Sequence, residues 1–240
     1  MVRDVPFFGE LYRLTTAPLL SAQVTLAEAD FIAATLELRQ GTSALDLGCG
    51  EGRHLEALGR SGASLFGVDF DRPALARAAR FARAVEGDLR ALPFKSGCLA
   101  NVYCWYSTLF VFDEAGNRRA LAEVARILRP GGRLLFQTVN AEHLAAEPGA
   151  RFEHRLPDGS MVREESHFGA ATGVDEGTRT LELPGGEILR GRYRLRYYQS
   201  AQLSEMFASA GLRIASMFGS IRGEAFSRQA LDLVALAVRE

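Results

Sequence analysis

Cysteine is scarce in this sequence, with three residues in 240, Cys49, Cys98 and Cys104. An odd number of cysteines without paired spacing does not form a disulfide framework. No group of cysteines and histidines has the spacing of a zinc site. We therefore predict no metal ion and a reducing, cytoplasmic location.

The sequence also lacks an excess of charge of either sign. Its 28 Lys and Arg and 29 Asp and Glu leave a formal net charge of −1. We therefore expect no nucleic-acid partner, because broad phosphate binding needs a basic surface. No apolar run is long enough to cross a bilayer, and the first residues lack the apolar core of a signal peptide, so we expect no membrane association. The length suits one globular domain with a large core.

Glycine, in contrast, is concentrated in one stretch. The apolar segment 44–47 is followed at once by Gly48, Gly50 and Gly52, and an amphipathic pattern begins after them. This order indicates a strand, a tight turn and a helix. Glycine allows positive φ and lets a ligand approach bare backbone, and the start of a helix presents free N–H groups. We predict a site for a polar or anionic ligand at the carboxyl end of a buried strand.

From residue 43 onward, apolar segments of strand length alternate with amphipathic segments of helix length. Such alternation predicts βαβ units, and hence a parallel sheet with helices on both faces. We therefore expect an α/β fold of the Rossmann-like, three-layer α/β/α type. The expected strands are 43–47, 64–68, 84–87, 99–105, 133–139, 213–218 and 231–239, and the expected helices are 52–60, 71–83, 113–128 and 200–210.

Two segments of this single domain, 1–240, depart from the alternation. Residues 1–40 are expected to form an N-terminal helical cap. Its main helix would begin at a capping box, Thr25 to Glu28, and run to about Leu38. Residues 141–197 are polar, and turn sequences separate segments of alternating character. They predict an inserted antiparallel β meander, which could form a lid over the active site.

Acidic residues stand at the ends of three successive predicted strands. Asp46 ends the first, Asp69 ends the second, and Asp88 follows the third. A carboxylate at position 69 can accept hydrogen bonds from both hydroxyls of a ribose. Phe70 offers a flat face to a purine, Leu89 can pack on the ring, and Asp88 can accept from an adenine amino group. Each acid alone could equally cap a turn or helix, but the carboxyl ends of parallel strands share one crevice.

Five short segments stand in the order and spacing of one family's motifs: Asp46-Leu-Gly-Cys-Gly-Glu-Gly52, Gly67-Val-Asp69, Gly87-Asp88, Leu92-Pro-Phe94 and Leu128-Arg-Pro-Gly-Gly132. Through them, roughly residues 20–140 resemble the class I S-adenosylmethionine-dependent methyltransferases. A weaker similarity to small-molecule methyltransferases covers 196–212. The family's usual Phe-Asp before the 99–105 strand is absent. The Asn-Pro-Pro-Tyr motif is also absent after that strand, which argues against methylation of adenine or glutamine amides.

The resemblance implies a seven-stranded, mostly parallel sheet with an antiparallel last strand, and S-adenosylmethionine as the cofactor. It implies that Asp46 and the glycine loop hold the amino-acid end, Asp69 the ribose, and Asp88 the adenine amino group. Tyr12 would close over the cofactor, and Tyr106 would line the substrate pocket. The full set of expected cofactor-binding residues is Asp46, Gly48, Cys49, Gly50, Gly52, Asp69, Phe70, Asp88, Leu89, Cys104, Trp105 and Tyr12.

Methyl transfer requires little chemistry from the protein, because the sulfonium already makes the methyl group electrophilic. The protein must align the acceptor, and it needs a base only when a proton must leave early. We therefore assign no definite catalytic residue. Tyr106 could orient an acceptor, although an ordinary core aromatic is an equally good interpretation. His143 could take a proton, but a histidine at a helix start or on the surface is the better interpretation.

We expect a methyltransferase that acts on a small-molecule acceptor by in-line displacement. One alternative is methylation of RNA or protein, which a basic strip along Arg192, Arg194 and Arg196 would support. If the meander forms a lid, these arginines could instead meet an anionic substrate. A nicotinamide-dependent oxidoreductase is disfavoured by the glycine spacing and by Asp88. A non-catalytic nucleoside-binding regulator is the remaining alternative.

Overall fold

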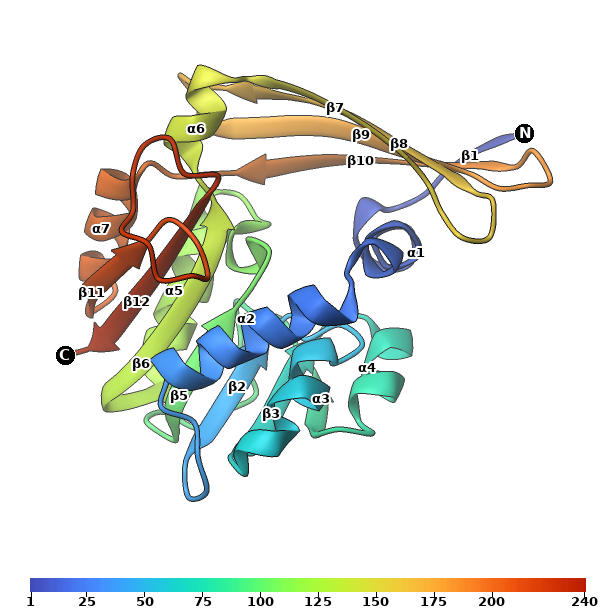
Figure 1. The fold of residues 1–240 in the computed structure, drawn as a ribbon. Coiled ribbons are helices and arrows are strands. Elements are labelled where there is room, and N and C mark those ends of the chain that lie inside the picture. The colour runs from blue at the N-terminus through green and yellow to red at the C-terminus, as the bar shows by residue number, and fades with distance from the viewer.

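Two β-sheets organise the chain in a computed structural model that describes residues 1–240 (Figure 1). The larger sheet has seven strands in the order β11-β12-β6-β5-β2-β3-β4. Only β12 runs antiparallel to its neighbours, which confirms the expected mostly parallel sheet with an antiparallel last strand. The strands are β2 (Ser43–Leu47), β3 (Ser64–Asp69), β4 (Arg83–Glu86), β5 (Leu99–Cys104), β6 (Leu128–Val139), β11 (Leu212–Phe218) and β12 (Asp232–Arg239).

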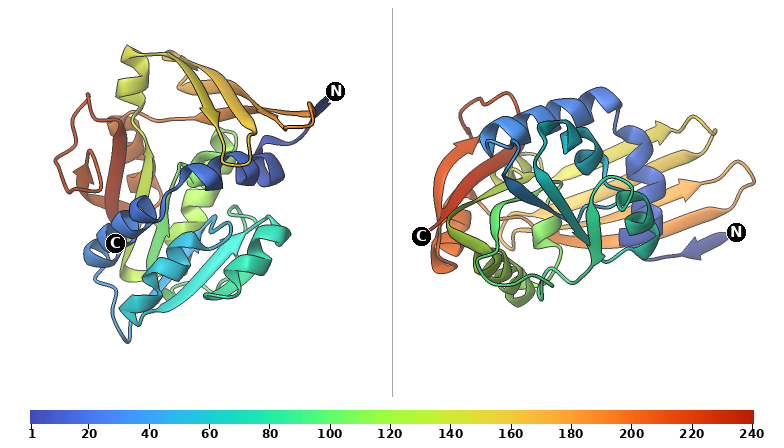
Figure 2. Two further views of the ribbon diagram at one scale, coloured as in Figure 1. Left: turned by 45° about the vertical axis from the view of Figure 1, so that its right-hand side comes forward. Right: turned by 90° about the horizontal axis from the view of Figure 1, so that it is seen from below.

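Helices cover both faces of this sheet (Figure 2). On one face lie α2 (Ala22–Thr35), α3 (Arg53–Leu58) and α4 (Arg72–Ala78), and on the other lie α5 (Glu114–Ile127) and α7 (Ser200–Ser209). Successive strand residues point to opposite faces, so Ala44 joins the core under α2 and Leu45 joins the core under α5. The structure confirms the three-layer α/β/α fold.

The second sheet has five strands in the order β1-β10-β9-β8-β7. It contains β7 (Gly149–Arg155), β8 (Met161–Gly169), β9 (Val174–Glu182) and β10 (Ile188–Arg196), which pair antiparallel, and β1 (Val2–Asp4), which pairs parallel with β10. Helix α6 (Ala141–Ala146) connects it to the end of β6. Figure 1 shows this five-stranded sheet extending across the end of the first sheet at which the parallel strands finish. The expected antiparallel meander is present.

The N-terminal segment is more than the helical cap expected for residues 1–40. Its first strand, Val2–Asp4, is too short to be recognised from sequence pattern and is held by pairing with β10. A short helical stretch follows, made of Phe7–Leu11, α1 (Tyr12–Thr16) and Ala17–Leu19. Phe7 packs with residues of the five-stranded sheet in a small core, so this segment belongs partly to that sheet.

The capping box expected at Thr25 is wrong, because α2 begins three residues earlier, at Ala22. The N-cap is Ser21, whose hydroxyl oxygen accepts from the Val24 N–H at 3.1 Å. The other boundaries differ by a few residues: the helix expected over 71–83 ends at Ala78, and β6 begins before the expected residue 133. None of the helices combines the length and the apolar composition that spanning a membrane would need.

Candidate cofactor and acceptor site

The glycine loop between β2 and α3 adopts the conformation that its sequence suggested. Gly48, Gly50 and Gly52 all have positive φ, at 72°, 52° and 84°. A Cβ on Gly48 would lie 2.2 Å from Cγ2 of Thr108, and one on Gly52 would lie 2.9 Å from the backbone of Ala78 in α4. Glycine is therefore required here for both the turn and the close packing around it.

Asp69, at the end of β3, is buried and ties the glycine loop to its own strand. One carboxylate oxygen accepts from the Gly50 N–H at 2.8 Å, and the other accepts from the Asp71 N–H at 2.9 Å. Burial raises the pKa of Asp69, and these two backbone hydrogen bonds oppose the rise. The acid predicted to bind a ribose is thus held in one orientation by the backbone.

Asp69→Ala should weaken binding of S-adenosylhomocysteine by roughly 1.5–3 kcal/mol, the usual value of hydrogen bonds to a charged group. Calorimetric titration would measure this change. Asp30→Ala, which removes an exposed acid on α2, serves as the control and should bind normally. Unchanged affinity in folded Asp69→Ala protein would mean that the ribose does not bind at Asp69.

Asp46, near the end of β2, is a buried carboxylate that forms no ion pair. Burial raises its pKa to about 7, and the Tyr103 hydroxyl and the nearby positive charge of Arg53 oppose the rise. The hydroxyl of the neighbouring Tyr103 is also buried without a partner. A cationic group of a ligand would compensate the Asp46 charge, because a buried carboxylate is costly when it is unpaired.

The residues predicted to bind adenine lie in different surroundings. Phe70 is 60% exposed and Leu89 is buried. Asp88 is half-exposed, and its carboxylate accepts from the Arg90 guanidinium at 2.8 Å and from the Arg90 N–H at 2.8 Å. The side-chain hydrogen bond from Arg90 lowers the pKa of Asp88. An adenine amino group would have to share this carboxylate with Arg90, and the role of Asp88 stays a prediction.

Cys104, the last residue of β5, and Trp105, which follows it, both have buried side chains. The Cys104 side chain is fully buried in the core under α5, and Trp105 is buried on the opposite face, between Phe31 and His54. Both side chains pack in the cores of the first sheet, and their assignment to the cofactor site stays a prediction. Successive residues of a strand point to opposite faces of the sheet, so Cys104 and Trp105 enter the two cores on its two sides. Cys49 is also buried, and burial raises the pKa of its thiol, as expected for an unreactive packing residue.

Tyr106 and Ser107, which follow β5 directly, both have positive φ, at 56° and 59°. Non-glycine residues adopt this conformation at a cost, and they do so most often at functional sites. The backbone N–H of Tyr106 donates to the Gln137 side chain at 2.7 Å, and its hydroxyl donates to Glu28 at 3.2 Å. Tyr106 is 39% exposed at the carboxyl edge of the sheet, and its contact with an acceptor stays a prediction.

A buried cluster around Glu28 supports Tyr106, and sequence analysis missed it. The Glu28 carboxylate pairs with Arg53, accepts from Tyr106, and lies 3.0 Å from Nε2 of His54. Burial alone would raise the pKa of Glu28, but the hydrogen bonds from His54 and Arg53 lower it overall. Nη2 of Arg53 is buried without a partner. The only sequence signal was the unusual pair Arg53 and His54 directly after the glycine loop.

Tyr12 and His143, two further candidates, do not belong to the cluster around Glu28. Tyr12 is partly exposed on α1, and burial raises the pKa of its phenol, with Asp69 and Arg53 among the charges that act on it. Its closure over the cofactor stays a prediction. His143 lies on α6 and no other group forms a hydrogen bond with its side chain, so the structure does not join it to Tyr106.

The arginines of β10 do not form a basic strip facing the site. Arg192 and Arg194 are exposed on the outer face of the five-stranded sheet, and Arg194 pairs with Glu176 at 3.0 Å. Arg196 pairs with Glu114 on α5 at 3.0 Å. The same outer face holds a groove of about 630 Å³ with mixed charges, lined in part by Glu165. The expectation that these arginines meet an anionic substrate is therefore wrong.

Comparison with known proteins agrees with this arrangement. A family model described as a methyltransferase domain matches residues 44–132. The cypemycin N-terminal methyltransferase of a Streptomyces species is 29% identical over 218 residues, which are 83% of this chain and 84% of that protein. Two further curated relatives are matched over only 31% and 42% of their own length.

Solved structures share the fold over almost the whole chain. The CcbJ methyltransferase from Streptomyces caelestis superposes with a TM-score of 0.82 at 21% identity, covering 98% of this chain and 97% of that one. An amino pentose methyltransferase from Micromonospora echinaspora, solved with S-adenosylmethionine bound, has a TM-score of 0.68 at 20% identity and covers 99% and 100%. Residues 44–132 therefore match a methyltransferase domain, and the chain shares the fold of solved S-adenosylmethionine-dependent methyltransferases over almost its whole length.

Proposed function

We propose that this enzyme methylates an amine nitrogen of a small-molecule acceptor, which binds between the carboxyl edge of the first sheet and the inner face of the five-stranded sheet. The observation that carries the proposal is the charge of that inner face. Glu164 and Asp175 lie on it, and Arg179, the cation beside them, is already paired with Glu164. An acidic surface favours a cationic acceptor such as an ammonium.

The names of two relatives support the same acceptor class, while other relatives are O-methyltransferases that act on malonyl-[acyl-carrier protein] or in ubiquinone biosynthesis. One similar protein is an N-terminal methyltransferase, and another acts on an amino pentose. Both names refer to substrates that carry an amino group. The outer face of the five-stranded sheet has mixed charges and gives no support to an RNA substrate.

The cofactor site that we propose uses the residues at the ends of β2 and β3. The unpaired Asp46 carboxylate fits the ammonium of the cofactor's amino-acid end, and the backbone-held Asp69 fits the ribose. The bound cofactor supplies an electrophilic methyl group on a sulfonium. The protein's contribution is to exclude water and to align the acceptor nitrogen, and Tyr106 is the residue best placed to do so. The three free thiols agree with a cytoplasmic location.

Two measurements test this proposal. Calorimetric titration should show micromolar binding of S-adenosylmethionine and S-adenosylhomocysteine and no binding of NAD. Formation of S-adenosylhomocysteine should then be followed with panels of amines, phenols and carboxylic acids as acceptors. We expect turnover with amines alone, and turnover with only phenols or carboxylic acids would refute the nitrogen acceptor.

A further inference from the structure

Asp175 on β9 is an acid that the cofactor site does not use. It is 6% exposed, its Oδ1 has no hydrogen-bond partner, and nothing forms an ion pair with it. Such a group is costly in a folded protein, because a buried carboxylate loses its hydration without compensation. A residue of this kind suggests a function that requires it.

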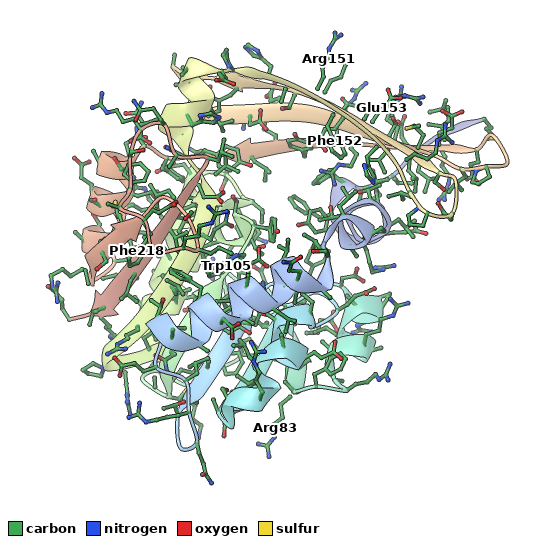
Figure 3. All side chains as sticks on the ribbon, in the orientation of Figure 1. Arg83, Trp105, Arg151, Phe152, Glu153 and Phe218 are labelled. Carbon is green, nitrogen blue, oxygen red and sulfur yellow. The ribbon has the colours of Figure 1, made fainter.

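The side chain of Asp175 lies on the inner face of the five-stranded sheet. Its register partners are Phe168 on β8 and Leu195 on β10, which pack in a small core with residues of α6. Figure 3 shows the same alternation on β7, where Phe152 lies on the side toward the first sheet and Arg151 points away from it. Asp175 is therefore directed toward the carboxyl edge and away from the solvent-facing groove.

Tyr197 connects Asp175 to the strained turn after β5. Burial and the Asp175 carboxylate both raise the pKa of the Tyr197 phenol, and the hydroxyl of Ser107 opposes the rise. Tyr197 packs in the same small core as Phe168, the register partner of Asp175, and as Val139, whose N–H donates to the Ser107 hydroxyl at 3.4 Å. An acceptor held at Tyr106, next to Ser107, would be within the neighbourhood of Asp175.

We propose that Asp175 binds the protonated amine of the acceptor and removes its proton before methyl transfer, an inference that rests on the proposed function. An ammonium has no free electron pair, so it cannot attack a methyl group. In the proton transfer, an N–H bond breaks, the proton moves to a carboxylate oxygen of Asp175, and the electron pair stays on nitrogen. The proton leaves to solvent after the methylated product is released.

The surroundings of Asp175 suit a base better than those of Glu28. Burial raises the pKa of Asp175, and the charge of Glu164 on β8 adds to this, while Tyr193, Ser166 and His167 oppose it. The Tyr193 hydroxyl already donates to Glu164 at 2.7 Å, so that proton is committed elsewhere. Glu28, in contrast, receives three donors and has a lowered pKa, which makes it a poor proton acceptor.

The test compares Asp175→Asn with Glu176→Gln, which changes the exposed neighbour on the same strand. Both proteins and the parent chain, saturated with S-adenosylhomocysteine, are titrated calorimetrically with glucosamine, alaninamide and cyclohexylamine at pH 7.5. At least one amine should bind the parent chain and Glu176→Gln equally, and should bind Asp175→Asn at least tenfold more weakly. If no amine binds the parent chain, or if the amines bind Asp175→Asn as well as they bind the parent chain, the proposed binding of the amine by Asp175 is refuted.

The single-turnover rate then tests the role of the base. With an amine substrate, the Asp175→Asn rate should be about 10²-fold or more below the parent rate at pH 7. It should rise about tenfold per pH unit toward the pKa of the free amine, roughly 10 for an alkylammonium. A loss of rate that is equal at every pH would indicate a structural role for Asp175 and refute its role as a base. Methylation of oxygen alone would refute the proposed function, while the titrations would still decide whether Asp175 binds ammonium.

Discussion

Lowering the pH from 7.5 to 5.5 should weaken the binding of S-adenosylhomocysteine about 20-fold, because Asp46 becomes protonated in the free protein. Burial raises the pKa of this carboxyl to about 7. Above that pH it is charged and can pair with the ammonium of the ligand, and below it the ligand must displace a proton. At a pH below the pKa of Asp46, binding should therefore release a proton, which calorimetry in buffers of different ionisation enthalpy would detect.

Asp46→Asn should remove this pH dependence and weaken binding at pH 7.5 by roughly 1.5–3 kcal/mol. Methylthioadenosine, which lacks the amino-acid end, is the matched ligand control. Its affinity should be the same in both proteins and should not change over this pH range. An equal pH dependence for methylthioadenosine and S-adenosylhomocysteine would contradict the assignment of Asp46 to the ammonium.

The same carboxyl should reduce the stability of the ligand-free protein. Its pKa is 3.8 in its unperturbed state and about 7 when folded, so the unfolded state loses the proton first as the pH rises. The stability contributed by the protonated form is complete below the unfolded pKa and is lost as the pH rises to 7. At higher pH the penalty is roughly 4 kcal/mol, and Asp46→Asn should be more stable than the parent by up to that amount in urea unfolding.

The sheet could be predicted from sequence because its strands are short apolar runs separated by helices. Ala44 and Leu45 illustrate this: both are apolar, since each faces a different covered side of the sheet. The glycine loop was also visible, because a turn at positive φ requires glycine at fixed positions. Strand β1 was not visible, since three residues have no pattern and depend on pairing with Ile188 to Arg190.

The site could be predicted only as far as local motifs extend. Asp69 was identified from its place at a strand end, but its hydrogen bond to Gly50 required the fold. The burial of the Trp105 side chain could not be predicted, because the point at which a strand's last residues enter the core depends on packing against α2. Asp175 gave no signal, since a single acid in a polar meander has the same pattern as an exposed one.

Glu28 is the clearest case of a residue whose role depends on distant partners. Thr25 to Glu28 has the pattern of a capping box, yet the Glu28 side chain is bound by Arg53, His54 and Tyr106. These partners lie 25, 26 and 78 residues away in the sequence. No local window contains them, and a helix start and a buried ion pair use the same residue types.

Glu28→Ala should destabilise the protein by about 3–5 kcal/mol, because it leaves the Arg53 charge and two further polar groups without their acceptor. The free energy of unfolding in urea at pH 7 would measure this. The lowered pKa of Glu28 means that its contribution is present above the unfolded pKa and is lost as the pH falls through the folded one. The difference between the variant and the parent should therefore narrow below about pH 4.

Glu56→Ala, which removes an exposed glutamate on α3, is the matched control and should change the stability by less than about 0.5 kcal/mol. Glu28→Gln keeps an acceptor for the Tyr106 hydroxyl but removes the charge opposite Arg53, so it should fall between the parent and Glu28→Ala. If Glu28→Ala were as mild as Glu56→Ala, the buried cluster would not be a structural support of the site. A large loss in Glu28→Ala with an intermediate loss in Glu28→Gln would establish that Tyr106 is held in position by a carboxylate that also stabilises the contact between α2 and α3.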